Sequence, residues 1–312
     1  MAIPAKPLSI LSFIIIMTNL TFKRILKFCN PVLVTKNLVW RYLSRKSYEP
    51  HVFVLGAPRS GTTLMFRILF VHPEFYGLDY ETFFFVPRNL FNDDKKCQLN
   101  NNFQSFSVEE IIQVRNHSRD IIHFYDNLAK LIATREDGRH FLEKTPPHVL
   151  YLRFLIKKLP NAKFIHMIRD GRDCYVSHKR LGPQSQWSIT DFAKMWRDHI
   201  VARQRVGDHH QIIDIKYEEF VQEPLKITKK IMNFLGEDFF DQQIDPKYYS
   251  NTNRVENPGH ERLKQPITSA SVGSWREKMT AKEIAIFNRI AGSKLQELGY
   301  DVSTTHPFLK QV

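Results

Sequence analysis

The chain has 312 residues, 43% of them hydrophobic and 12% aromatic, which is enough to build a substantial globular core. Its 45 lysines and arginines exceed its 32 aspartates and glutamates, so the formal net charge is +13. This surplus suits a polyanionic ligand, nucleic acid or an anionic membrane surface. The sequence has no paired CxxC or aromatic RNP run, which argues against a nucleic-acid module. Three cysteines at unrelated spacings indicate neither a disulfide framework nor a zinc site, and they favour a reducing compartment.

Residues 1–48 are apolar and basic, and we expect them to form a helical segment apart from the main domain. Within them, residues 8–22 are apolar but interrupted by polar side chains, and they are shorter than the ~20 residues that a spanning helix needs. No small-residue cleavage site follows, so a secretory signal is not predicted. The pattern favours a buried or surface-lying helix over a true span. Basic residues on its C-terminal side favour a cytoplasmic location, with membrane association left open.

The stretch from residue 51 to residue 72 carries the strongest chemical signal. An apolar run at 51–55 ends in Gly56, and Gly61 opens a stretch with helical periodicity, which predicts strand, tight turn and helix. Such a turn aims backbone N–H groups and a helix dipole at one point, where a phosphate or sulfate oxygen binds well. Thr62 and Thr63 replace the Lys-Ser/Thr of a triphosphate P-loop, which weakens that interpretation. Arg59 remains as a fixed cation inside the turn and points to anion transfer without magnesium.

The rest of the chain predicts an alternating series of strands and helices. We expect an irregular aromatic connection at 72–91 and one long helix from Ser107 to Ala133, capped by Ser107 with Glu110 in the capping-box position. Further strands are expected at 141–145, 163–168 and 212–216, and further helices at 148–159, from about 173, at 187–206, 224–235 and 280–298. This order predicts one α/β domain at 49–303, followed by a tail at 304–312. The expected fold is P-loop-like and three-layered, with a central, mostly parallel sheet flanked by helices.

Residues 58–65, PRSGTTLM, resemble the 5′-phosphosulfate loop of sulfotransferases that use 3′-phosphoadenosine 5′-phosphosulfate (PAPS). The residues look most like the protein-tyrosine sulfotransferase branch and its bacterial relatives, and the resemblance runs roughly from His51 to Tyr300. It implies transfer of a sulfuryl group from PAPS to an acceptor hydroxyl, with PAPS as co-substrate and no metal. The phosphosulfate would then be held by Arg59 and by the backbone N–H groups of Ser60, Gly61, Thr62 and Thr63.

A second anion-binding turn follows the strand predicted at 163–168. Arg169 at the strand end and Ser177 one helical stretch later can hold the same phosphate from two sides, and the resemblance implies that this is the 3′-phosphate. Tyr217 matches a family tyrosine near the adenosine. A late segment resembles the one that closes over the cofactor. Either Ser271 or Ser274 is near enough to bind the nucleotide there, and the sequence does not decide between them.

The resemblance also implies catalytic roles. Lys144 stands where the family places a lysine on the oxygen that bridges phosphate and sulfate, and with Arg59 it would stabilise the charge that grows there. The acceptor hydroxyl needs a base, and Glu81 is the candidate, with Asp79 in reserve because the chain has one extra residue nearby. The family's second acid is Tyr80 here. The acceptor therefore stays open among a protein tyrosine, a glycan, a lipid and a small metabolite.

Three other interpretations of the sequence stay open. A P-loop kinase or NTPase would need a lysine after Gly61 and a metal-binding carboxylate. A nucleic-acid binder would account for the net charge, and a pseudo-enzyme would bind the nucleotide without transferring anything. Lumenal tyrosine sulfotransferases carry a disulfide cysteine just before the catalytic acids, where this chain has residues 77–79, GLD. That difference makes the Golgi lumen a less favoured location than the cytoplasm.

Overall fold

The computed structural model describes residues 31–78, 81–86, 107–134, 137–182, 187–250 and 261–302. The expected apolar segment at 8–22 and the tail at 304–312 lie outside these residues, as do Asp79 and Tyr80. The centre of the protein is one sheet of five parallel strands in the order β2-β3-β1-β4-β5. The strands are β1 (Val52–Gly56), β2 (Phe75–Gly77), β3 (His140–Lys144), β4 (Lys163–Ile168) and β5 (Ile212–Lys216).

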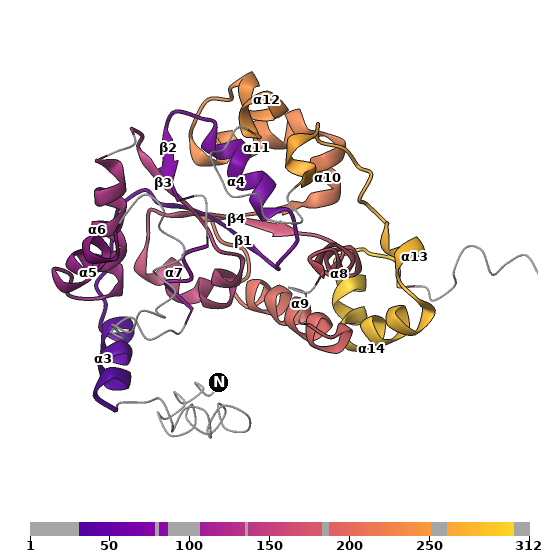
Figure 1. The fold of residues 1–312 in the computed structure, drawn as a ribbon, viewed down its shortest axis with the longest axis horizontal. Helices are drawn as coiled ribbons and strands as arrows, with labels where there is room; N and C mark the ends of the chain where they lie inside the picture. Colours follow the sequence, from indigo (N-terminus) through magenta and orange to yellow (C-terminus); the bar gives the residue numbers. More distant parts are fainter. Residues whose placement is uncertain are drawn as a thin grey trace, which may run out of the picture.

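Helices cover both faces of the sheet, as Figure 1 shows. In chain order they are α3 (Pro31–Tyr42), α4 (Thr62–Phe70), α5 (Val108–Asn116), α6 (Ile121–Ala133), α7 (Leu152–Lys158), α8 (Gly171–Lys179), α9 (Ile189–Gln204), α10 (Tyr217–Gln222), α11 (Pro224–Leu235), α12 (Pro246–Tyr249), α13 (Trp275–Lys278) and α14 (Ala281–Glu297). Short 3₁₀ turns lie at Pro146–Tyr151, Asp241–Ile244 and Glu261–Lys264. The expected three-layer α/β fold with a central parallel sheet is confirmed.

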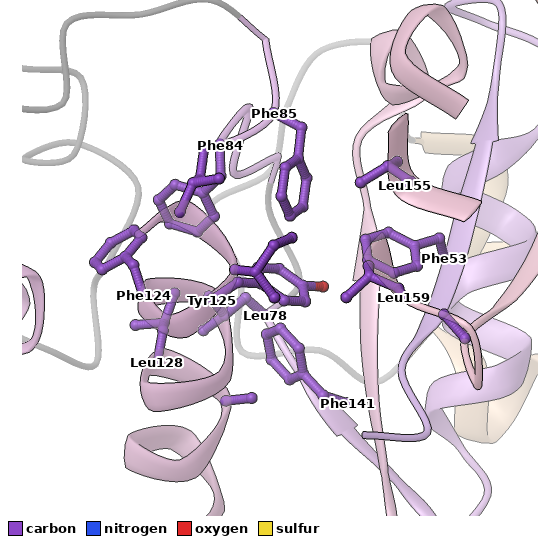
Figure 2. Packing of buried hydrophobic residues seen from close by; sticks show 14 of the residues in the cluster. Phe53, Leu78, Phe84, Phe85, Phe124, Tyr125, Leu128, Phe141, Leu155 and Leu159 are labelled. Atoms are coloured by element: carbon purple, nitrogen blue, oxygen red, sulfur yellow. The ribbon is translucent and has the colours of Figure 1, made fainter. Parts of the chain in front are cut away.

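The alternation of side chains along β1 builds the two halves of the core. Val52 and Val54 pack with residues of α4, α10 and α11, whereas Phe53 and Leu55 pack with residues of α5, α6 and α7. On the second face, shown in Figure 2, the Phe53 ring stacks on Tyr125 and on Phe164, with centroids 5.5 and 5.2 Å apart. A central strand that is buried on both faces carries no polar alternation, which is why 51–55 could be predicted as a strand.

Two expectations for the chain before β3 are wrong. The connection at 72–91 contains strand β2, which pairs with β3 from Phe75 opposite His140 to Gly77 opposite Leu142. The single helix expected from Ser107 to Ala133 is two helices, because the Asp120 carboxylate caps a new one by accepting from two backbone N–H groups at 2.9 Å.

Helix ends that carry their own sequence signals were predicted well. The Ser107 hydroxyl and the Glu110 carboxylate form the expected capping box at the start of α5, at 3.1 and 2.7 Å. Helix α11 ends at Gly236, whose φ of 80° is the left-handed conformation that glycine favours. In the part of the chain that is described, no helix has both the length and the apolar character needed to cross a bilayer.

Candidate active site

The turn between β1 and α4 is strained in a way that fits glycine. Gly56 and Gly61 have φ values of 151° and 97°. A Cβ on Gly56 would lie 2.4 Å from the Met167 carbonyl oxygen, and one on Gly61 would lie 2.5 Å from the Tyr217 ring. Helix α4 begins directly after this turn, and no described side chain caps it. The turn therefore presents the start of a helix at the carboxyl end of the central strand, where anions bind.

Arg59 lies inside this turn, with a φ of 70°, and its Nε donates to the Ser177 hydroxyl on α8 at 3.2 Å. Burial lowers the pKa of Arg59, and the positive charge of Arg169 lowers it further. Two guanidinium groups held in one place repel each other, so an anion between them would be stabilised. The first and second predicted anion-binding turns thus meet at a single site.

Arg169 is the link between the remaining predicted cofactor residues. Its guanidinium donates to the backbone carbonyl oxygens of Arg59 and Ser271, at 3.3 and 3.0 Å. The same group lies over the Tyr217 ring, with Cζ 4.2 Å from the ring centroid, and Tyr217 shares a hydrogen bond of 3.0 Å with the Ser271 hydroxyl. Arg169 Nε is buried and has no hydrogen-bond partner among the described residues. The Ser60 hydroxyl is also buried and has no partner among these residues. Two buried polar groups at this site are therefore available to hydrogen-bond a ligand.

The two candidate serines have different partners. The Ser274 hydroxyl donates to the Asp173 carboxylate on α8 at 2.9 Å. That carboxylate also accepts from the backbone N–H groups of Gly273 and Trp275, at 2.7 and 2.9 Å. Ser274 is thus tied to the network that fastens the late segment to α8, whereas Ser271 lies against Tyr217. Ser271 therefore lies with Arg169 and Tyr217, two of the other residues predicted to hold the cofactor.

The two proposed catalytic groups outside the turns contact each other. Lys144 is the last residue of β3, and its Nζ donates to Oε1 of Glu81 at 3.1 Å. The lysine side chain is 5% exposed and the glutamate side chain 34% exposed. The carboxylate can therefore meet a solvent-borne acceptor while the ammonium stays inside. The reserve candidate, Asp79, lies outside the described residues.

A buried network that the sequence analysis missed holds the segment that carries Glu81. The Glu143 carboxylate is fully buried and accepts from the hydroxyls of Thr82, at 2.7 Å, and Thr145, and from Nδ1 of His148 at 3.0 Å. The Thr145 hydroxyl in turn accepts from the Thr82 backbone N–H at 2.9 Å. Burial alone would raise the pKa of Glu143, but the His148 charge and these hydrogen bonds outweigh it, and the pKa is lowered. The available signal was a glutamate within a strand that is buried along its whole length.

Thr145→Val tests this network with almost no change in shape. It should lower the free energy of unfolding by about 1–3 kcal/mol, because it removes the acceptor of buried N–H groups and a donor to a buried carboxylate. The measurement is urea unfolding. Thr228→Val is the matched control, since Thr228 is fully buried and its hydroxyl has no partner among the described residues. Equal effects of the two substitutions would show that the Thr145 hydrogen bonds are not stabilising.

This parallel sheet, with two arginine-bearing turns meeting at its carboxyl edge, has the architecture of α/β proteins that bind ligands at the carboxyl ends of their strands. The sequence model of the sulfotransferase family matches residues 50–241. The chain belongs to the sulfotransferase family, whose enzymes transfer a sulfuryl group.

Individual relatives agree with this assignment. A putative protein-tyrosine sulfotransferase of Caenorhabditis briggsae is 25% identical over 84% of this chain and 92% of its own length. An uncharacterized protein of Aquifex aeolicus is 26% identical over 72% of this chain, which spans only 30% of that protein. A mouse sulfotransferase solved in complex with PAP has a TM-score of 0.50 and 18% identity, over 86% of this chain and 91% of that one. The last comparison shows a shared fold.

Proposed function

We propose that this chain transfers a sulfuryl group from PAPS to the hydroxyl of an acceptor. The observation that carries the proposal is the meeting of Arg59 and Arg169 at one site, next to two buried polar atoms without partners among the described residues. The mouse relative in fold was solved with PAP, the desulfated form of the same nucleotide. An anionic nucleotide would supply the negative charge and the hydrogen-bond acceptors that this site requires.

Each predicted cofactor residue has a role in this proposal. Arg59 binds the 5′-phosphosulfate together with the backbone N–H groups of the turn and the first residues of α4, which are those of Ser60, Gly61, Thr62 and Thr63. Arg169 and Ser177 bind the 3′-phosphate, and Tyr217 and Ser271 lie along the nucleoside. The assignment is supported by the contacts of Arg59 with Ser177 and of Arg169 with Tyr217 and Ser271.

The chemistry proposed is a direct displacement. PAPS supplies the sulfuryl group when bound. Glu81 accepts the proton of the acceptor hydroxyl as the new oxygen–sulfur bond forms. Lys144 and Arg59 stabilise the negative charge that remains on the bridging oxygen as the old bond breaks. Because these two cations carry the charge stabilisation, the mechanism requires no metal ion.

The domain limits and the location are proposals of the same kind. We assign the transferase domain to residues 49–303, with an N-terminal segment at 1–48 and a tail at 304–312. The upper limit is supported by a contact of Arg172, which is buried against the Trp275 ring. The Arg172 guanidinium donates to the Asp301 carbonyl oxygen at 2.6 Å. We favour the cytoplasm over the Golgi lumen. The acceptor is a hydroxyl-bearing molecule, and a kinase-like P-loop protein remains the alternative.

Calorimetric titration with PAP tests the proposal and separates it from the alternative. We expect micromolar or tighter binding that is the same with and without Mg²⁺. Arg169→Ala should weaken it by at least about a hundredfold, since a buried, charge-assisted contact is lost. Arg276→Ala, at a partly exposed guanidinium on α13, is the control and should leave the affinity unchanged. Binding of ATP in place of PAP, dependent on Mg²⁺, would favour the kinase-like alternative.

A further inference from the structure

Helix α3 presents an apolar surface outward. Leu38 and Val39 are 47% and 46% exposed, and Tyr42 and Leu43, at the end of the helix, are 64% and 76% exposed. At about 100° per residue, Leu38 and Tyr42 lie on the side of the helix opposite Trp40, which is buried in the core. Val39 and Leu43 lie beside them on one flank. A cluster of large exposed side chains on one helix marks a contact surface rather than scattered surface residues. We call Leu38, Val39, Tyr42 and Leu43 the α3 apolar face.

The described charged residues next to this face are mostly basic, and the Asp120 carboxylate pairs with Arg45 at 3.4 Å. Four basic residues lie in or just after α3, and residues 31–48 contain no aspartate or glutamate; the four are Lys36, Arg41, Arg45 and Lys46. Lys46 follows the last residue of the face, Leu43, by three positions. The end of α7 lies beside it, because Lys158 Nζ donates to the Ser44 carbonyl oxygen. Burial lowers the pKa of Lys158, and the charges of Lys157 and Lys46 lower it further, whereas the Asp120 charge raises it.

Helix α3 is also fastened to the segment that carries Glu81. The Arg41 guanidinium donates to three successive backbone carbonyl oxygens, those of Phe84, Phe85 and Val86, at 3.0, 2.9 and 2.8 Å. Glu81 precedes the first of them by three residues, which is at most about 11 Å of extended chain. The helix that carries the α3 apolar face is therefore held close to the segment that carries Glu81, the proposed base. In Figure 1, α3 stands on the same side of the molecule as α5 and α6.

We propose that the α3 apolar face docks the protein on an anionic lipid bilayer. The apolar side chains enter the boundary between headgroups and acyl chains, and the surrounding lysines bind lipid phosphates. A second copy of the chain is a poor occupant, because it would bring the same positive charges to the same interface. Docking in this position selects acceptors whose hydroxyl is presented at the bilayer surface. That selection, unlike the docking itself, rests on the sulfuryl transfer proposed above.

Vesicle sedimentation of the full chain tests the docking. We expect binding to vesicles of equal parts phosphatidylcholine and phosphatidylserine, weakening as salt rises, and much weaker binding to phosphatidylcholine alone. Leu38→Gln combined with Leu43→Gln should weaken binding about tenfold or more, because two apolar side chains no longer enter the lipid. The matched control is Leu150→Gln combined with Leu225→Gln, two leucines that are each 43% exposed elsewhere. The control should bind vesicles as the unmodified chain does.

PAP titration of both double variants shows whether they are folded, since none of these leucines belongs to the nucleotide site. Vesicle binding that survives Leu38→Gln with Leu43→Gln in a protein that still binds PAP would overturn the proposal. So would equal binding to the two kinds of vesicle. Light scattering gives the third contrary result, a dimer that becomes a monomer in the α3 variant while neither binds vesicles. If the unmodified chain does not bind PAP, that result contradicts the proposed function and leaves the docking result unaffected.

Discussion

Arg59→Ala is expected to reduce the rate of sulfuryl transfer by about 10³-fold, because it removes a preplaced cation from the point where charge develops. It should also weaken PAP binding by about tenfold or more, since one charged hydrogen-bond donor to the phosphate is lost. Arg59 has a φ of 70°, a left-handed conformation that is unfavourable for any residue with a Cβ. Alanine also has a Cβ, so the backbone cost is unchanged and the measured effect comes from the loss of the guanidinium. Both values follow from single-turnover kinetics and calorimetry on the same preparation.

Two further variants sharpen this test. Arg59→Lys keeps a positive charge but replaces the planar guanidinium that contacts Ser177, and it should recover only part of the lost rate. Arg197→Ala changes a surface arginine paired with the adjacent Asp198, and it should behave as the unmodified enzyme does. Full activity in Arg59→Ala would mean that this turn does not bind the transferred group.

Glu81→Gln is expected to lower turnover by about 10²–10⁴-fold, since an amide cannot accept the acceptor's proton. PAP binding should stay equal or become tighter, because the buried Lys144 ammonium loses its carboxylate partner at 3.1 Å and becomes available to the nucleotide. The two variants therefore separate the roles of the residues: both lose turnover, and only Arg59→Ala loses affinity.

Asp79→Asn is the matched comparison for Glu81→Gln. If Glu81 is the base, Asp79→Asn retains most of the activity. The opposite pattern, with full turnover in Glu81→Gln and little in Asp79→Asn, would transfer the role to the reserve candidate. The assay needs an acceptor, and the docking proposal suggests hydroxyl compounds anchored in anionic vesicles as the first set to try.

Prediction from sequence succeeded where structure is determined locally. The apolar run at 51–55, the capping box at Ser107 and the end of α11 at Gly236 each carry their signal within a few residues. Strand β2 was missed because three residues at the edge of a sheet have no periodicity of their own. They are a strand only because β3, more than sixty positions later, lies beside them.

By itself, the sequence determined the parallel α/β fold and the position of the two strand–turn–helix units that are predicted to bind anions, because glycine placement and strand–turn–helix order are local properties. Only the tertiary structure decided which side chains meet. The Ser274 hydroxyl donates to Asp173, 101 positions away, whereas the Ser271 hydroxyl shares a hydrogen bond with Tyr217. Likewise, Lys144 contacts Glu81, and Arg41 holds the segment that follows it. Such contacts depend on how strands and helices pack, and the spacing of residues along the chain does not predict that packing.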